Sequence, residues 1–273
     1  MLRFNDPLML VGAGKMGGAL LSGWLGQGLA PESVFLRDPT PPADIAQLVA
    51  EKGLRLNLPL DEMAVAPRIV VLAVKPQIMD TVLPDLRPLV RPGTLFLSIA
   101  AGVDLGRLDE LLGGGAAIVR AMPNTPASVG KGITAIFGNA LVTADDRAVC
   151  EGLLGTVGNV VWLTQENQID AVTALSGSGP AYVFALAETM AAAGEALGLD
   201  PNLAAQLART TVVGAGAMLD VLPEDAATLR KNVTSPGGTT AAALDVVLGS
   251  EGLAQLMRVA MTAARDRSRE LSK

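Results

Sequence analysis

A glycine-rich segment near the N-terminus constrains the fold more than any other part of this chain. The short apolar run Leu8–Val11 is typical of a buried strand, and the segment Gly12–Gly17 (GAGKMG) then leads into the helical pattern Met16–Gly26. A G-x-G-x-x-G spacing at this junction permits a tight turn at its first glycine. It also lets a pyrophosphate approach the backbone at the second, and the helix pack closely on the strand at the third. The segment predicts a βαβ unit whose helix N-terminus binds the phosphates of a dinucleotide.

Strand-like and helical patterns alternate through the first half of the chain. Several strand-like runs are almost entirely apolar, as expected for central strands that are covered on both faces. We expect strands at Leu8–Val11, Val34–Arg37, Ile69–Val74, Thr94–Ile99, Ala117–Arg120, Ile133–Phe137 and Asn159–Leu163, with helices at Met16–Gly26 and Asp44–Glu51. The predicted fold class is therefore α/β, with an N-terminal Rossmann-type, doubly wound, mostly parallel sheet.

Strand signals stop near residue 164, and long helical patterns rich in Ala and Leu follow. They predict helices at Asn167–Leu197, Asn202–Val221, Ala241–Leu248 and Gly252–Leu271. Asp200 precedes Pro201 as a helix cap before a first-position proline, which supports the start of the second of these helices. We expect residues 1–164 to form the NAD(P)-binding Rossmann domain. Residues 165–273 should form an all-α C-terminal domain suited to dimerisation, to which the resemblance described below adds substrate binding.

The composition excludes several kinds of chemistry. The chain has no histidine, which removes Ser-His-Asp hydrolysis, His-ligated metals and reactions that need a histidine proton donor. Its one cysteine, Cys150, excludes an internal disulfide framework and a Cys-based zinc cluster, so no metal site is expected. A net charge of −6 without a basic run argues against a nucleic-acid partner. The protons of any reaction must come from other groups.

The apolar content points to self-association. Apolar residues make up 50% of the chain before its 30 glycines are counted, whereas a soluble domain has about 45–50% with glycine included. The charge-free stretch Ala171–Ala187 is interrupted by Ser176–Pro180, and the N-terminus lacks the pattern of a secretory signal. We therefore expect a cytoplasmic protein without membrane contact, part of whose apolar surface lies in a subunit interface.

Two residues at the end of the second predicted strand leave the choice of cofactor open. An acid there can bond the ribose 2′-hydroxyl of NAD, as Asp38 would, whereas a basic side chain such as Arg37 can pair with the 2′-phosphate of NADP. The preference depends on which of the two points toward the ribose. We favour NADP and keep NAD as the alternative.

Small and turn-forming residues follow three predicted strands at the carboxyl edge of the sheet, where ligands of such folds bind. Ala73–Pro76 ends one predicted strand and can offer backbone contacts to the cofactor ribose, or can be a simple strand terminus with a solvated lysine. Ser98–Gly102 and Met122–Pro126 can line the nicotinamide pocket in the same way.

A second anion site is predicted far from the first. Thr234–Thr240 (TSPGGTT) places four hydroxyl-bearing residues around a Pro-Gly-Gly turn, directly before the helical pattern Ala241–Leu248. Free amides at a helix N-terminus, together with hydroxyls, attract a carboxylate or a phosphate. The alternative is a helix-capping turn without a ligand. For Ser176–Pro180 we favour a structural interpretation, in which small residues allow close helix packing, over a role in a binding site. Glu166 is interpreted as a charge on a helix surface.

These motifs together resemble the pyrroline-5-carboxylate reductase family over nearly the whole chain. The resemblance is carried by Gly12–Gly17, Ala73–Pro76, Ser98–Val103, Arg120–Pro126, Ser176–Tyr182 and Thr234–Thr240, which occur in the family's order. It implies NAD(P)H-dependent reduction of 1-pyrroline-5-carboxylate to L-proline by a Rossmann domain joined to a helical dimerisation domain. It also implies a homodimer that can assemble further into a decamer, a pentamer of dimers.

The resemblance also assigns roles to individual residues. It implies that Thr240 bonds the ring nitrogen as the catalytic hydroxyl. The substrate-binding residues it implies are Val233, Ser235, Gly237, Gly238, Thr239 and Thr240. The cofactor-binding residues expected from the motifs and the resemblance are Gly12, Ala13, Gly14, Lys15, Met16, Gly17, Arg37, Asp38, Ala73, Val74, Lys75, Pro76, Ala100 and Asn232.

Two other functions were weighed against this one. A β-hydroxyacid dehydrogenase shares the domain plan but typically uses a lysine of the helical domain as its acid. This domain has only Lys231 and Lys273, neither within a long helix facing the expected cleft. A non-catalytic NAD(P)-sensing or scaffold protein would bind the cofactor without oxidising it in the presence of a cyclic imine.

Overall fold

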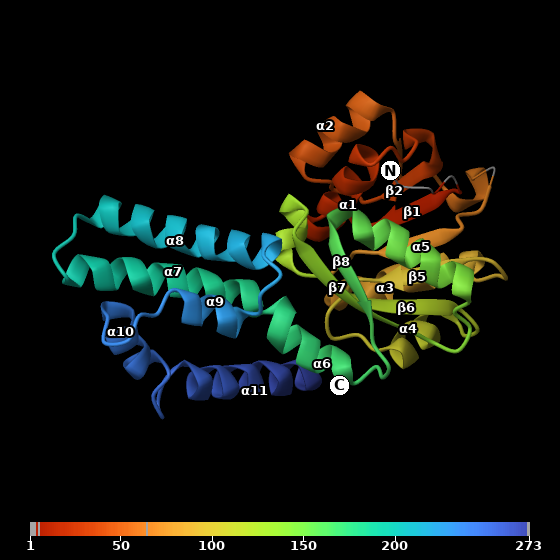
Figure 1. The fold of residues 1–273 in the computed structure, drawn as a ribbon. Coiled ribbons are helices and arrows are strands. Elements are labelled where there is room, and N and C mark those ends of the chain that lie inside the picture. The colour runs from red at the N-terminus through yellow and green to blue at the C-terminus, as the bar shows by residue number, and fades with distance from the viewer. Residues whose placement is uncertain (1–3, 5, 64, 272–273) are drawn as a thin grey trace. The chain divides into compact units, whose positions relative to one another are not determined.

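The computed structural model describes residues 4, 6–63 and 65–271, which form two compact units (Figure 1). The first unit contains the chain up to Gly177 together with its end from Arg265, and the second contains Ser178–Ala264. The last helix, α11 (Leu253–Leu271), therefore begins in the second unit and ends in the first. The predicted boundary at residue 164 lies between the last strand and the helices that follow it, and does not coincide with the division between these two units. The boundary stays a prediction.

The first unit is built on one eight-stranded sheet with the order β3-β2-β1-β4-β5-β6-β7-β8. Its strands are β1 (Leu8–Val11), β2 (Val34–Arg37), β3 (Arg55–Leu56), β4 (Ile69–Leu72), β5 (Leu95–Ser98), β6 (Ala117–Met122), β7 (Gly132–Gly138) and β8 (Gly158–Trp162). All neighbouring pairs are parallel except β6 and β7. Those two are antiparallel because the link between them, residues 123–131, is too short for a crossover helix. The predicted mostly parallel sheet is confirmed.

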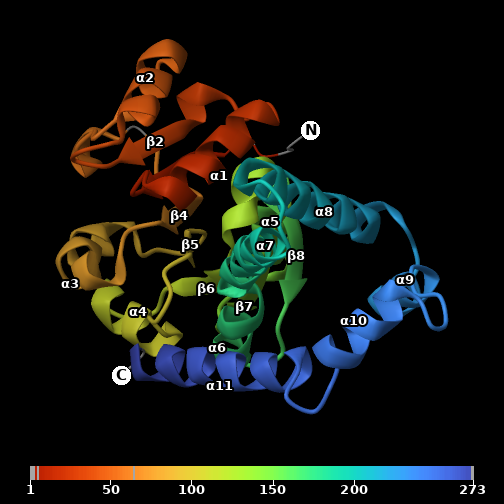
Figure 2. The same cartoon turned by 90° about the vertical axis from the view of Figure 1, so that its left-hand side faces the viewer.

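Helices cover both faces of this sheet (Figure 2). Within the first unit they are α1 (Lys15–Gly26), α2 (Ala43–Lys52), α3 (Met79–Val82), α4 (Leu105–Leu112), α5 (Ala144–Leu154) and α6 (Gln168–Val172). Successive strand residues point to opposite faces, so Leu10 lies in the apolar layer with α1 and α5, and Val11 in the layer with α3 and α4. Trp24 of α1 is fully buried in the first layer and donates from Nε1 to Leu153 O at 2.9 Å. The sheet is thus doubly wound.

The helical pattern predicted at Asn167–Leu197 is divided into two helices by a π-helical turn, Thr173–Gly177. Hydroxyls in and beside this turn bond to preceding carbonyls, as Thr173 Oγ1 does to Ile169 O at 2.8 Å. Asn124 from the β6–β7 link donates to Ser176 O at 3.1 Å and accepts from Ile133 N at 2.9 Å. Side chains therefore replace part of the regular helical hydrogen bonding.

The second unit contains α7 (Gly179–Ala196), α8 (Pro201–Val221), α9 (Ala226–Asn232) and α10 (Thr239–Val247), with the first part of α11. Asp200 caps α8 as predicted, accepting from Asn202 N at 3.0 Å. The close packing of α7 on α8 uses small residues, since a Cβ added to Gly194 would lie 3.2 Å from Ala204 Cβ. None of the described helices is long and apolar enough to cross a membrane.

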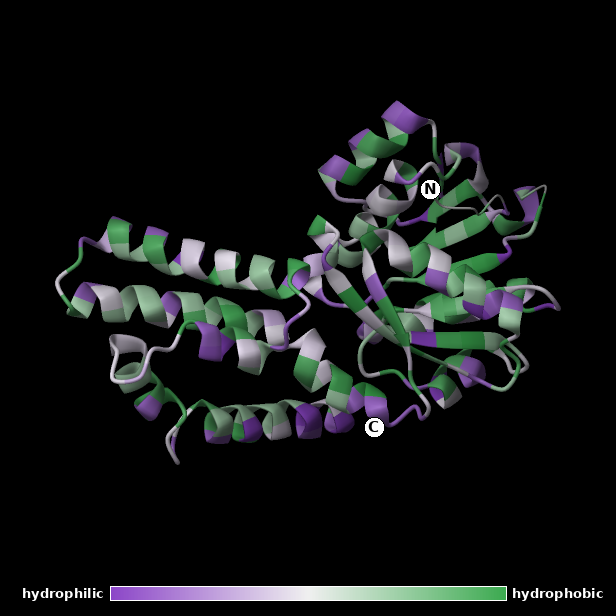
Figure 3. Ribbon diagram, viewed as in Figure 1, coloured by the Kyte–Doolittle hydropathy of each residue, from purple (hydrophilic) through white to green (hydrophobic). Residues whose placement is uncertain are grey.

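The helices of the second unit carry many hydrophobic residues (Figure 3), and several of their large apolar side chains are exposed. Phe184 of α7 is 67% exposed and Leu256 of α11 62% exposed, whereas the fully buried apolar residues of this unit are the alanines Ala204 and Ala208. Exposed apolar surface of this extent is typical of a subunit interface.

Candidate functional site

The glycine-rich loop adopts the strand–turn–helix geometry that its sequence predicts. Gly12 follows β1 with φ of +91°, a conformation that other residues rarely adopt, and its amide donates to Arg37 O at 2.9 Å. A Cβ on Gly17 would come closer than 3.0 Å to Gly12 O, whereas a Cβ on Gly14 would have no atom within 4 Å. The first and third glycines thus serve the turn and the packing, and the second leaves open space beside the backbone.

The N-terminus of α1 is free of side-chain caps. Gly14 occupies the N-cap position, and Gly18 N makes the bond that closes the first turn, to Gly14 O at 2.7 Å. The amides of Lys15, Met16 and Gly17 precede it, in positions to which helix geometry gives no carbonyl partner. These amides form the positive end of the helix dipole, which suits the phosphates of a dinucleotide.

A cavity of about 790 Å³ opens beside this turn. Its lining includes Ala13, Gly14 and Lys15 of the loop and the start of α1, Ser22 further along α1, and Ser128 of the β6–β7 link. Its lining does not include Ala73–Pro76 or Ala100, so it flanks the loop rather than extending over the carboxyl edge of the central strands.

Two of the predicted cofactor residues at the carboxyl edge, Ala73 and Val74, lie against the loop. A Cβ on Gly12 would come within 2.8 Å of Ala73 O and 3.0 Å of Val74 Cγ1, so these two residues border the turn. Lys75 is exposed and Pro76 half-buried at the start of the next segment. Ala100 is buried after β5, the strand beside β4. The structure thus brings the loop and Ala73–Val74 together.

Arg37 and Asp38 differ in their surroundings. The Arg37 side chain is 32% exposed and forms a long ion pair, 3.4 Å, with the exposed Asp85. The Asp38 carboxylate accepts from Ala13 N at 2.8 Å and from Thr40 N at 2.9 Å. Asp38 therefore bonds to the glycine-rich loop itself, a contact that the sequence did not predict.

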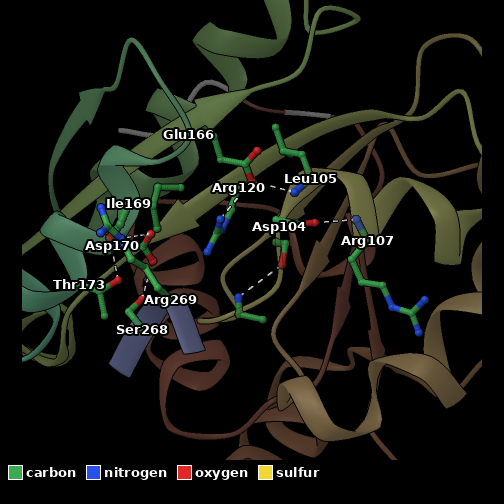
Figure 4. Close-up of polar contacts among 12 residues, drawn as sticks. Asp104, Leu105, Arg107, Arg120, Glu166, Ile169, Asp170, Thr173, Ser268 and Arg269 are labelled. Atoms are coloured by element: carbon green, nitrogen blue, oxygen red, sulfur yellow. Dashed lines mark hydrogen bonds and ion pairs between the residues drawn. The ribbon is translucent and has the colours of Figure 1, made fainter. Parts of the chain in front are cut away.

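A buried ion pair lies near the start of α4 (Figure 4). Arg120 of β6 has 6% of its side chain exposed and donates from Nη1 to Glu166 Oε1 at 3.0 Å. The same oxygen accepts from Leu105 N at 2.8 Å, the first residue of α4. The interpretation of Glu166 as a surface charge was wrong, because this carboxylate caps α4 and neutralises a buried guanidinium. No sequence pattern joins residues so far apart in the chain.

A second polar contact in Figure 4 fixes the end of α11 to α6. Ser268 donates from Oγ to Asp170 Oδ1 at 2.7 Å, and Arg269 Nε lies 3.6 Å from Asp170 Oδ2. Gly102, in the loop before α4, lies against Leu271, because a Cβ there would be 3.3 Å from Leu271 O. The end of α11 thus packs beside the loop that carries Ala100.

The turn Thr234–Thr240 belongs to the second unit and forms a helix N-terminus, as predicted. Gly237 has φ of +71°, Gly238 is the N-cap of α10, and Gly238 N donates to Ser235 O at 3.0 Å. No side chain caps α10. Ser235 and Thr239 are exposed and Thr240 is half-buried.

The remaining predicted residues adjoin this turn. Asn232 ends α9, and Val233, which follows it, is 60% exposed. Lys231 is exposed in the last turn of α9, and Lys273 lies outside the described residues. Of the two lysines weighed for a carbonyl reductase, the described one thus sits at the end of a short helix.

Comparisons with known proteins matched two family models. Residues 166–271 match the model for pyrroline-5-carboxylate reductase dimerisation, and residues 7–102 match that of an NADP oxidoreductase, coenzyme F420-dependent. A pyrroline-5-carboxylate reductase of Pseudomonas aeruginosa is 39% identical, over 97% of this chain and 96% of the relative. One of Pisum sativum is 36% identical, over 97% and 96% respectively.

Solved structures of similar proteins superpose over almost the whole chain. A pyrroline-5-carboxylate reductase of Coxiella burnetii matches with a TM-score of 0.91 and 36% identity, covering 99% of this chain and 100% of that one. Plasmodium falciparum pyrroline carboxylate reductase with NADP bound matches with a TM-score of 0.82 and 30% identity, covering 98% and 99%. The similarity therefore includes both units.

Proposed function

The chain belongs to the pyrroline-5-carboxylate reductase family, and on this premise we propose that it reduces the C=N bond of 1-pyrroline-5-carboxylate to give L-proline, the last step of proline biosynthesis. The observation that carries the proposal is the similarity of the whole chain to these reductases, at 39% identity over 97% of its length. A nicotinamide cofactor supplies the hydride when bound.

We assign the phosphates of this cofactor to the glycine-rich loop and the N-terminus of α1. The uncapped first turn and the open space at Gly14 support this assignment. The ribose and nicotinamide are assigned to the carboxyl edge of β4 and β5. The residues proposed there are Ala73, Val74, Lys75, Pro76 and Ala100, with Asn232 as a further contact.

NADP is the proposed cofactor, with NAD as the alternative. Among the described residues, the half-buried side chain of Arg37 has one long ion pair, with the exposed Asp85, and such a pair costs little to break when a 2′-phosphate is offered instead. The NADP bound to the Plasmodium falciparum relative agrees with this choice.

The substrate carboxylate is assigned to the N-terminus of α10. Its uncapped amides and the hydroxyls beside them form the type of site that binds carboxylates. The proposed contacts are Val233, Ser235, Gly237, Gly238 and Thr239. Thr240 is proposed to bond the ring nitrogen and orient it for hydride addition. A cyclic imine protonated on nitrogen is already an electrophile, so the absence of histidine from the sequence is no obstacle.

We further propose a homodimer formed by the helical unit, with a pentamer of dimers as the larger assembly. The exposed apolar side chains of α7 and α11 need a partner to cover them, and residues 166–271 match a dimerisation model. A cytoplasmic location stays a prediction from the sequence.

A spectrophotometric assay tests the proposed reaction. The protein should oxidise NADPH, and NADH more weakly, only when 1-pyrroline-5-carboxylate is present; no oxidation of either nucleotide would refute the function. Thr240→Ala should lower kcat by less than the roughly hundredfold expected when a general acid is removed. Ser235→Ala should instead raise KM for the pyrroline. An undiminished kcat in Thr240→Ala would refute the role of that hydroxyl.

A further inference from the structure

Both oxygens of the Asp38 carboxylate accept hydrogen bonds from backbone amides. Oδ2 accepts from Ala13 N at 2.8 Å, and Oδ1 accepts from Thr40 N at 2.9 Å. Ala13 lies inside the glycine-rich loop, so the first bond connects the end of β2 to the turn that begins at Gly12. Hydrogen bonds to an ionised carboxylate are among the stronger ones in proteins.

Asn57 holds Asp38 from the other side. Its side chain pairs with both backbone groups of Asp38: Oδ1 accepts from Asp38 N at 2.9 Å, and Nδ2 donates to Asp38 O at 2.8 Å. Its own amide donates to Leu36 O at 2.8 Å. Asn57 also has φ of +54°, a left-handed conformation that asparagine tolerates better than most residues. The main chain at Asp38 is thus fixed by a residue in an uncommon conformation.

We propose that Asp38, fixed by Asn57, is a positioning residue for the phosphate-binding loop and does not read the adenosine ribose. The inference rests on the proposed function, because it requires a dinucleotide at this loop. An acid at the end of the second strand usually bonds the ribose 2′-hydroxyl and so favours NAD. The Asp38 carboxylate is oriented by Ala13 and Thr40 instead, and its effect falls on the loop that both nucleotides share.

The ratio of the two affinities separates these roles. An ionised carboxylate keeps further lone pairs after accepting two bonds, so its bonds to Ala13 and Thr40 leave it able to bond the ribose as well. A loss of affinity measured with one nucleotide alone therefore does not distinguish a loop anchor from a ribose contact. Loss of a loop anchor weakens NADPH and NADH by the same factor. Loss of a ribose reader weakens NADH alone, and removes a negative charge that repels the 2′-phosphate of NADPH.

The test measures the dissociation constants of NADPH and NADH for the full-length protein by nucleotide fluorescence. Asp38→Asn, which keeps one acceptor oxygen, should raise both constants about tenfold, in line with one lost charge-assisted bond. Asp38→Ala should raise both further. In each variant the ratio of the two constants should stay within about twofold of wild type. Asp145→Asn, the same change at an exposed position of α5, should alter neither constant.

Asn57→Ala provides a second route to the same answer. It leaves the carboxylate in place but frees the main chain of Asp38, so both constants should rise together, by less than in Asp38→Ala. In the double variant Asp38→Ala/Asn57→Ala the combined effect should be smaller than the product of the single effects, because both act on one loop. If the Asp38 variants do not fold, the two constants measured for Asn57→Ala alone decide the question.

Three results overturn the inference. A shift of the ratio by more than about tenfold toward NADPH in Asp38→Asn makes Asp38 a ribose reader. Unchanged dissociation constants in Asp38→Ala, or in Asn57→Ala, refute the proposal that Asp38 positions the phosphate-binding loop. Failure of the wild-type protein to bind either nucleotide refutes the proposed function, and with it the inference, whereas the other two results leave the proposed function standing.

Discussion

The same added methyl group should have opposite consequences at two glycines of one loop. In Gly17→Ala the new Cβ meets Gly12 O at less than 3.0 Å and Ala73 Cβ at 3.1 Å, and neither neighbour is a flexible side chain. Overpacking of this kind costs about 1–3 kcal/mol. A loss of about 2 kcal/mol lowers Tm by about 4–8 °C in a unit of this size. In Gly14→Ala the methyl meets no atom within 4 Å, and the backbone angles suit alanine, so Tm should hold or rise slightly.

Thermal unfolding and NADPH titration together test this reasoning. Gly14→Ala should unfold like the wild-type protein yet bind NADPH at least about tenfold more weakly, because the methyl occupies the space assigned to the pyrophosphate. Gly26→Ala, at the exposed last residue of α1 with no atom near its new Cβ, is the matched control and should change neither quantity for the worse. An unaltered Tm in Gly17→Ala would refute the close-packing argument. Wild-type affinity in Gly14→Ala would refute the assignment of the phosphates.

Three further predictions concern buried polar groups. Glu166→Ala leaves the Arg120 guanidinium buried without its carboxylate and should lower the free energy of unfolding in urea by about 3 kcal/mol; a loss under about 1 kcal/mol would contradict this. Burial by itself raises the pKa of the Asp146 carboxyl, but bonds from Thr143 and Arg68 outweigh it and hold this pKa below its ordinary 3.8. The stabilisation by the ionised Asp146 carboxylate is therefore complete above about pH 4 and is lost as the pH falls through the folded pKa. The free energies of unfolding of wild type and Asp146→Asn should converge as the pH is lowered through this range, and a difference that stays constant would contradict this. Burial raises the pKa of the Cys150 thiol to about 12, so iodoacetamide at pH 8 should label it only after unfolding, and rapid labelling of the native protein would contradict its burial.

The strands were the most predictable part of the fold. β1 and β2 have the bounds that the sequence predicts, because each is a short run of side chains buried on both faces and ended by a glycine or proline turn. The helix α4 was not predicted, although its capping residue Asp104 and the leucines that follow at helical spacing were a usable signal. The antiparallel pairing of β7 depends on which strand it meets in the sheet. Apolar pattern alone does not reveal that.

Within the candidate site, predictability followed distance along the chain. The turn at Gly12 and the helix N-terminus after the Pro-Gly-Gly turn come from residues that are adjacent in the sequence, and both formed as expected, although α10 begins at Thr239, two residues before the predicted start. The partners of Asp38 and Glu166 could not be foreseen, because the former meets a loop from another strand and the latter a helix 61 residues away. Such contacts exist only once the sheet has assembled.

The path of α11 also limits how this protein can be divided. The helical unit is an interruption within the chain of the first unit, which resumes at Arg265 and is held through Ser268. A chimera that exchanges everything after one junction would therefore replace Ser268, the hydrogen-bond partner of Asp170, and Leu271, the neighbour of Gly102, with residues of another protein. An exchange with two junctions, before Ser178 and after Ala264, keeps both native. Recombination, whether in evolution or in the laboratory, should therefore exchange the helical unit as an internal insertion with two junctions and not as a C-terminal domain with one.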